Sequence, residues 1–224
     1  MIQRTQLTSE AEVLGTLLHS LCQPLTTLRC SLELAADRPP DTQGEVIPAA
    51  LEQADRAILA VQLIREYLEI VNATNPRQLT PLSPALDAVL VQLSVVAEVR
   101  RIPLLKTGSS CAEVFADQFW LRRALSYLIG AALEAASSGN AIVVALEDTP
   151  AGTLLIVKSL SCSESQGVPA HPLSAPVHLR DAHIAIANRI LAFAGIPLEY
   201  FDNTRSGFIL RIPRAKAIAQ KLSA

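Results

Sequence analysis

The sequence predicts an α+β protein, in which an N-terminal helical hairpin is followed by an α/β sandwich. Apolar residues recur at alternating intervals of three and four over residues 9–71, whereas helix and strand patterns alternate over residues 76–224. The charge divides at the same place: residues 1–75 hold five basic and ten acidic residues, and the remainder holds fourteen and eleven. A proline-marked stretch at residues 75–84 is therefore interpreted as a linker between domains 1–75 and 76–224.

The first helix is predicted to begin with a capping box, with Ser9 as the N-cap and Glu12 reaching back to it. It is predicted to end before Pro39-Pro40. Its apolar stripe has the spacing of a coiled-coil seam. The stripe consists of Leu14, Leu18, Leu21, Leu25, Leu28, Leu32 and Ala35.

A second capping box at residues 42–45 precedes the other helix of the hairpin. Its stripe consists of Ile47, Leu51, Ala54, Ile58, Val61, Ile64, Leu68 and Val71. Two helices joined by a short loop cannot bury both stripes by themselves. The sequence therefore predicts a homodimer whose two hairpins form a four-helix bundle.

The second part is predicted to be a mixed sheet with helices on one face. Helices are expected over residues 84–100, beginning at Ser83-Pro84, over 118–136, capped by Asp117, and over 181–194, ending at Gly195. Residues 159–178 are expected to form a loop. The expected strands, rich in Val, Ile and Leu, are residues 102–105, 113–116, 141–146, 153–157, 198–201 and 208–212.

The composition excludes several classes of protein. With 50% hydrophobic and 18% charged residues, the 224-residue chain can bury a core. A net charge of −2 supplies no basic field for nucleic acid or an anionic membrane surface. No apolar run approaches the roughly 18 residues of a spanning helix, and the N-terminus lacks a signal-peptide pattern. The four cysteines are widely spaced, without metal-ligand spacing, so we expect a cytoplasmic protein that holds no metal.

One histidine is expected to be exposed on a helix that also contains a proline. His19 lies beside the seam formed by Leu18 and Leu21, so it is expected to face solvent. Pro24 interrupts the hydrogen bonds of the same helix and is expected to kink it. A neutral imidazole nitrogen can act as a nucleophile. An ordinary polar residue on a helix surface is the alternative interpretation of His19.

The segment His19-Ser20-Leu21-Cys22-Gln23-Pro24-Leu25 resembles the phosphoacceptor box of bacterial two-component sensor histidine kinases, in which proline follows five positions after the histidine. Residues 114–125, 182–195 and 208–213 resemble, in the same order, further segments of the ATPase domain of that family. The resemblance implies a dimerisation and phosphotransfer hairpin followed by a domain of the histidine-kinase ATPase type.

The departures from that family pattern imply that the kinase chemistry is lost. Tyr127 and Ala131 stand where the family has asparagines that hold magnesium and phosphate, and residues 159–163 lack the adenine-binding aspartate. Asp181 and His183 stand where the family has the lid glycines that present backbone N–H groups to phosphate. Because several of these elements are lost together, we expect no ATP binding and no cofactor, with magnesium only on a partner protein. In addition, Ser20 replaces the acidic residue that acts as the base when the family's histidine attacks ATP.

The resemblance implies a histidine phosphotransferase, which would pass phosphoryl groups between response-regulator aspartates through His19. The predicted regulator-docking residues are Ser20, Cys22, Gln23, Thr26 and Arg29, and a plain solvated helix edge is the alternative. Receiver domains of response regulators are the expected partners. Two other functions stay open: a pseudokinase scaffold that binds a sensor kinase or a regulator, and a divergent active kinase.

Overall fold

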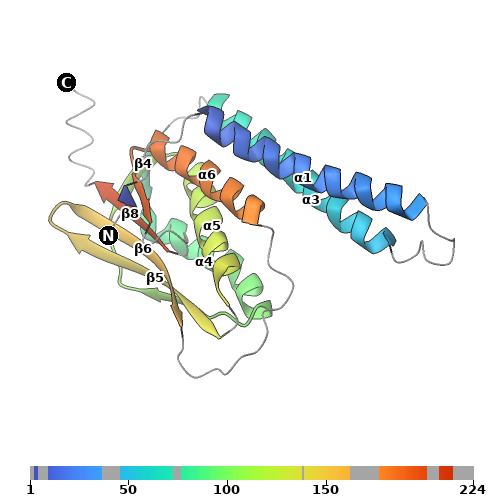
Figure 1. The fold of residues 1–224 in the computed structure, drawn as a ribbon. Coiled ribbons are helices and arrows are strands. Elements are labelled where there is room, and N and C mark those ends of the chain that lie inside the picture. Colours follow the sequence, from blue (N-terminus) through green and yellow to red (C-terminus); the bar gives the residue numbers. More distant parts are fainter. Residues whose placement is uncertain are drawn as a thin grey trace. The chain divides into compact units, whose positions relative to one another are not determined.

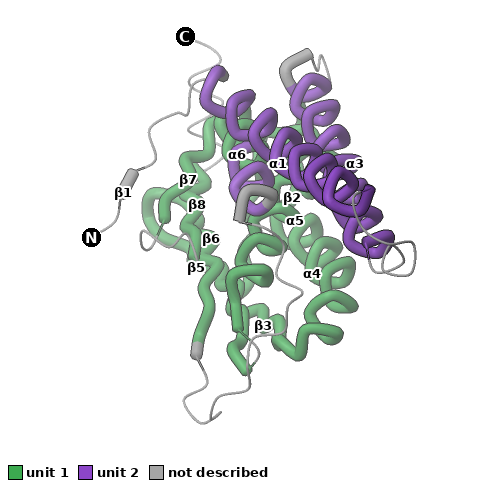
Figure 2. Tube along the Cα trace, turned by 45° about the vertical axis from the view of Figure 1, so that its right-hand side comes forward, with its two compact units in different colours: residues 1–8, 74–175, 186–224 green, residues 9–73, 176–185 purple. Residues whose placement is uncertain are grey.

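The computed structural model describes residues 3–4, 10–36, 46–72, 77–137, 139–161, 177–200 and 207–213. The chain divides into two compact units, which Figure 2 shows in different colours. One unit comprises residues 9–73 and 176–185, and the other comprises residues 1–8, 74–175 and 186–224. The division at residue 73 lies close to the expected boundary at residue 75, whereas residues 1–8 and 176–185 are grouped differently from that expectation.

The smaller unit contains the helical hairpin. Its helices are α1 (Glu10–Ala36) and α3 (Val46–Asn72), which lie side by side (Figure 1). Both end within a few residues of the predicted limits. The expected capping residues Ser9 and 42–45 lie outside the described residues.

The residues that the hairpin buries are offset from the predicted stripes. The buried residues are Val13, Leu17, Ser20 and Pro24 in α1 and Ala57, Ala60, Leu63, Tyr67 and Ile70 in α3. Several members of the predicted stripes are exposed, namely Leu14, Leu18, Leu25, Leu32, Ile47, Leu51, Ile58, Val61 and Leu68. Each helix therefore carries a packed face and a second, exposed apolar face.

The larger unit is built on a six-stranded sheet with the order β1-β7-β8-β6-β5-β3. The β3–β5 pair is parallel and the other pairs are antiparallel, so the sheet is mixed, as predicted. Its strands are β1 (Gln3–Arg4), β3 (Leu104–Thr107), β5 (Asn140–Thr149), β6 (Gly152–Ser161), β7 (Leu198–Tyr200) and β8 (Phe208–Pro213). The strand β1 was not predicted, because two residues carry no readable alternation.

A second, two-stranded sheet corrects the interpretation of residues 75–84 as a linker. β2 (Gln78–Pro81) pairs antiparallel with β4 (Glu113–Ala116). Thr80 is buried, and its hydroxyl donates to the Ala116 carbonyl at 3.0 Å. Pro81, the last residue of β2, is compatible with such a strand, because proline is tolerated at the ends and edges of small sheets.

Helices α4 (Leu82–Val99), α5 (Gln118–Ala135) and the C-terminal half of α6 (Val177–Phe193) cover one face of the six-stranded sheet (Figure 1). Asp117 is confirmed as an N-cap, since its carboxylate accepts from the backbone N–H groups of Phe119 and Trp120 at 2.8 and 3.1 Å. Ser83 is not a cap, because α4 begins one residue earlier and the Ser83 hydroxyl accepts from Lys106 Nζ at 2.9 Å.

Helix α4 also corrects the expectation that no apolar run approaches the length of a membrane span. All 18 of its residues form a window with a mean hydropathy of 1.5, so α4 could span a membrane by length and composition alone. A core helix of a globular domain passes the same test. Asp87 and Glu98 interrupt this window, so it does not form a continuous apolar run in the sequence.

Candidate functional site

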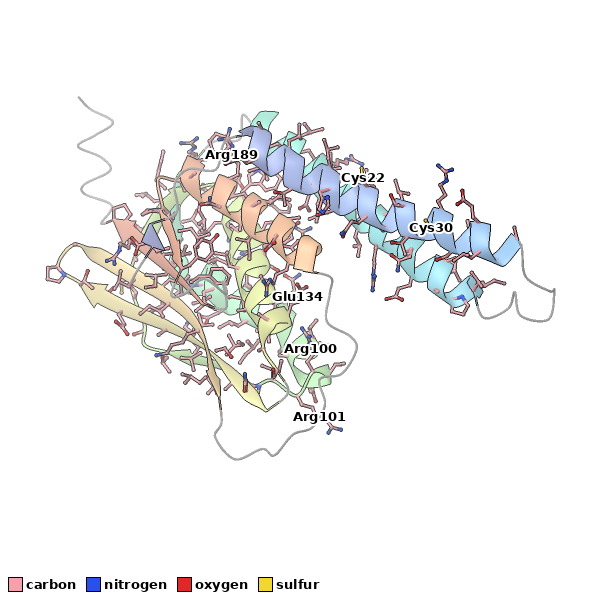
Figure 3. All side chains as sticks on the ribbon, in the orientation of Figure 1. Cys22, Cys30, Arg100, Arg101, Glu134 and Arg189 are labelled. Carbon is pink, nitrogen blue, oxygen red and sulfur yellow. The ribbon has the colours of Figure 1, made fainter. Side chains whose placement is uncertain are left out.

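His19 lies in the N-terminal half of α1 and is exposed. Cys22, Gln23 and Thr26 are exposed on the same helix within the next two turns, as expected from their spacing. Figure 3 labels Cys22 and, two turns further on, Cys30, and both thiols are free. We call the exposed residues His19, Cys22, Gln23, Thr26 and Arg29 the His19 face.

Ser20 does not belong to the His19 face, which corrects its prediction as a docking residue. Its side chain is buried, with 7% exposure, and its hydroxyl donates to the Thr16 carbonyl at 2.9 Å. The reason is periodicity: Ser20 continues the packed series that begins with Val13 and Leu17, which alternates intervals of four and three. A small side chain is tolerated there because its one donor is satisfied within the helix.

The helix continues through Pro24, which is buried. Proline has no N–H, so it cannot donate to the carbonyl four residues earlier, that of Ser20. A missing hydrogen bond thus lies directly after the exposed histidine. Thr26 donates its hydroxyl to the Cys22 carbonyl at 2.8 Å, so its side chain is held against its own helix.

Arg29 is exposed, as expected, and it has a partner that the sequence analysis did not name. Its Nε lies 2.7 Å from Glu33 Oε1, one turn further along α1. Both side chains are more than half exposed, so the pair contributes little to stability. The guanidinium is therefore presented at the helix surface beside a carboxylate rather than alone.

The positions that match the metal-holding asparagines lie inside the larger unit. Tyr127 is 7% exposed and Ala131 is fully buried, both on α5. The Arg123 guanidinium carbon lies 4.8 Å from the centre of the Tyr127 ring, which is a cation–π geometry. These residues offer a phenol ring, a methyl group and a guanidinium, and none of the three is a ligand for a hard cation.

The positions that match the lid glycines of the histidine-kinase family lie within a helix. Asp181 and His183 lie in α6, which begins at Val177, four residues before the predicted start. The N–H groups inside a helix are used in hydrogen bonds to preceding carbonyls, so they are not presented to a phosphate group. Of the segment 159–163, residues 159–161 form the end of β6, and Cys162 and Ser163 lie outside the described residues.

A polar cluster that the sequence analysis missed lies at the opposite end of β6. Ser110 and Thr153 each donate a hydroxyl to Asp148 Oδ1 at 2.6 Å, and their two hydroxyls are 3.1 Å apart. The cluster lines a cavity of about 240 Å³. Because Ser110 is distant in the sequence from Asp148 and Thr153, which face each other in the β5–β6 hairpin, no local pattern could have predicted it. It ties the segment before β4 to the β5–β6 hairpin.

An apolar groove of about 500 Å³ lies between the helices of the hairpin. It is lined by Leu28, Leu32, Ala35, Ala36, Val46, Ile47, Ala50, Leu51 and Ala54. Six members of the two predicted stripes lie among these residues. Within the described part of the chain, no group of three His, Cys, Asp or Glu side chains is arranged to hold a metal ion.

The fold defined by this hairpin and this sheet domain is that of histidine kinases, although no family model matches the chain. The Acinetobacter baumannii histidine kinase AdeS has a TM-score of 0.60 at 19% identity, over 88% of this chain and 98% of that one. Histidine kinase ThkA, solved in complex with the response regulator protein TrrA, has a TM-score of 0.61 at 17% identity, over 92% of this chain and 62% of that one. A Burkholderia phymatum histidine kinase has a TM-score of 0.50 at 18% identity, over 89% of this chain and 98% of that one.

Proposed function

We propose that this protein is a histidine phosphotransferase of a two-component phosphorelay, which moves phosphoryl groups between response-regulator aspartates without binding ATP. One observation carries the proposal. An exposed histidine precedes Gln23-Pro24 on a hairpin helix, whereas the positions for metal-binding asparagines in the same chain hold the buried Tyr127 and Ala131. The fold shared with histidine kinases supplies the context.

In the proposed reaction, a ring nitrogen of His19 attacks the phosphorus of an aspartyl phosphate on a regulator. The new nitrogen–phosphorus bond forms as the phosphorus–oxygen bond to the aspartate breaks, and the carboxylate leaves with the electron pair. The reverse step passes the phosphoryl group to the aspartate of a second regulator. The regulators supply the magnesium and the acidic site, and this protein supplies the nucleophile.

The proposed docking surface for receiver domains is the His19 face. Cys22, Gln23 and Thr26 offer a mixed polar and apolar surface, and Arg29 offers a charge partner for acidic groups on a receiver. ThkA, one of the proteins of similar fold, was solved in complex with a response regulator. The proposal places this reaction in the cytoplasm, where exposed thiols such as Cys22 and Cys30 remain reduced.

The proposal includes a homodimer formed by the two hairpins. The exposed apolar face of each hairpin contains leucines of α1 together with leucines and isoleucines of α3, and it borders the 500 Å³ groove. Contiguous apolar surface of this kind is rare on monomers and common at interfaces. A second copy of the hairpin, placed on this face, would complete a four-helix bundle.

The test is transfer of phosphoryl label from receiver domains charged with acetyl phosphate. The wild-type protein should gain acid-labile label, His19→Ala should gain none, and His183→Ala should behave like the wild type. Circular dichroism should show that both variants fold. His19 is exposed, and substitution of an exposed helical residue changes stability by less than about 0.5 kcal/mol, while His183 is only half-buried. Binding of a regulator without any label on His19 would contradict the transferase and favour a pseudokinase scaffold.

A further inference from the structure

Helix α4 of the larger unit carries a broad apolar face that is exposed. Its 18 residues have a mean hydropathy of 1.5, yet only 33% of them are buried. Val91 is 73% exposed and Val99 is 72% exposed. Burial in the core of the unit therefore accounts for only part of the apolar character of this helix.

The exposed apolar residues of α4 have the spacing of a helix-pairing seam. Ala88, Val91, Val95 and Val99 are exposed, and on an ideal helix they fall within an arc of about 80°. Intervals of three and four residues are those of a coiled-coil contact. Single exposed valines are normal, whereas a continuous apolar row is typical of an interaction site. We call these four residues the valine face.

Charged residues of both signs lie at each end of the valine face. Near the start of α4, the Asp87 carboxylate accepts from Lys106 Nζ at 2.6 Å. Near its end, Glu98 and Arg101 are exposed, and Figure 3 labels Arg101. If two copies of α4 paired in opposite directions, the Asp87 end of one would lie beside the Arg101 end of the other. Acidic and basic groups would then face each other, and the two helix dipoles would be opposed, which is favourable.

Arg101 occupies a position at which glycine is the usual residue. It follows Arg100, the C-cap of α4, with φ 56°, and its N–H donates to the Glu98 carbonyl at 2.9 Å. The turn by itself favours glycine, because a side chain is strained in this left-handed region. Arg100 has a partner within the chain, since it donates to the Leu133 carbonyl at 3.0 Å. The exposed guanidinium of Arg101 is thus available at the end of the valine face.

We propose that the valine face pairs with the valine face of a second copy of this chain, in antiparallel orientation. The small Ala88 then lies opposite the partner's Val99, and Arg101 lies beside the partner's Asp87. A single helix pair buries less than the roughly 1,200 Å² typical of stable complexes, so the association is weak. The contact is separate from the proposed hairpin dimer and does not rest on phosphotransfer.

A membrane surface fits the valine face less well than a second copy does. Helices that lie on membranes have a polar face rich in Lys and Arg, whereas α4 contains neither residue. The charged side chains of α4 are Asp87 and Glu98, and anionic lipid would repel both.

The test is self-association of the full chain carrying Leu32→Glu, so that the hairpin dimer does not contribute. Sedimentation equilibrium from about 10 µM to about 1 mM covers the range of a weak contact. Mass should rise reversibly with concentration, and adding Val95→Glu should weaken the association at least tenfold. Leu160→Glu is the matched control, because it places the same charge at an exposed apolar residue of β6, outside α4. Circular dichroism checks that each variant folds.

Arg101→Gly separates the contact from the turn. It should weaken self-association and raise the temperature of unfolding, whereas unchanged association would overturn the antiparallel pairing. Absence of association up to about 1 mM, or equal association of the Val95→Glu and Leu160→Glu variants, would overturn the proposal as a whole. Flotation with vesicles of phosphatidylcholine and phosphatidylserine that is lost in Val95→Glu would overturn it in favour of a membrane surface.

Discussion

Leu17 and Leu18 are neighbours in α1 and have opposite surroundings: Leu17 is fully buried and Leu18 is 47% exposed. Two consecutive leucines on one helix point about 100° apart, so they mark the two apolar faces of the hairpin. The face of Leu17 is packed within the single chain. The face of Leu18 includes Leu14, Leu25 and Leu32, all of them exposed.

The exposed face predicts the outcome of a charge substitution at the proposed dimer interface. Leu32→Glu should convert the dimer into a monomer that keeps its helical content. Each buried leucine contributes roughly 1.5–3 kcal/mol, and the change occurs in both copies. Leu34→Glu is the matched control, since Leu34 is equally apolar and exposed and does not belong to the stripe. Sedimentation velocity at micromolar concentration should separate the two variants, and a monomeric wild type would contradict the proposed dimer.

Mg-ATP should produce no heat of binding in calorimetry at millimolar ligand. The expectation follows from the buried Tyr127 and Ala131 and from the helical backbone at Asp181 and His183. Tyr127→Asn/Ala131→Asn should not create binding, because the other nucleotide contacts are still missing. The double variant should also lose stability, because an amide placed at the fully buried Ala131 costs about 1–3 kcal/mol without partners. A micromolar dissociation constant for the wild type would favour the active-kinase interpretation.

Arg29→Glu should slow association with a receiver domain, most strongly at low salt, because charges at the rim of an interface act on the association rate. Glu33→Gln is the informative control. It removes the carboxylate 2.7 Å from Arg29 and leaves the guanidinium in place, so association should not slow. Stopped-flow rates at two salt concentrations provide the measurement. If both variants slow association equally, the charge of Arg29 is not the cause, and a general change of the α1 surface is.

Asp117→Ala should lower the free energy of unfolding by about 1 kcal/mol, because two backbone N–H groups at the start of α5 lose their acceptor. Asp117→Asn should restore most of the stability, since an amide oxygen also caps a helix. Urea denaturation followed by circular dichroism measures both. Equal losses for alanine and asparagine would show that charge, rather than capping, is responsible.

Two glycines should respond in opposite ways to alanine. Gly108 has φ +74°, and a Cβ there would collide with the Leu146 carbonyl oxygen, so Gly108→Ala should destabilise the fold. Gly15 lies inside α1 with open space around its Cβ position, so Gly15→Ala should stabilise by roughly 0.5–1 kcal/mol. Thermal unfolding of the two variants, measured side by side, tests the pair.

The sequence was informative where a local pattern determines the structure. The hairpin, the cap at Asp117 and the strand at residues 113–116 follow from periodicity and from side-chain hydrogen bonds over a few residues. The two apolar stripes of the hairpin were also informative, although several of their members are exposed rather than packed. The apolar pattern of α1 does not distinguish the face that contacts α3 from a neighbouring face.

Other features depend on contacts that no local pattern records. The pairing of β2 with β4 joins residues that are distant in the sequence, and so does the contact of Ser110 with Asp148 and Thr153. The burial of Ser20 shows the same limit within a single helix. A serine next to an exposed histidine looks like a surface residue until its place in the packed series is known.

The pairing of Gln3 with Tyr200 has a consequence for biosynthesis. The ribosome makes Gln3 before the hairpin and Tyr200 well after it, so this pair has a very large sequence separation and can form only after both helices of the hairpin have been made. The hairpin lies between them and consists of local contacts, so it can form on the nascent chain before the sheet is complete. In topological terms, the hairpin is an insertion within the sheet domain, whose edge strand β1 can pair only after β7 has been made.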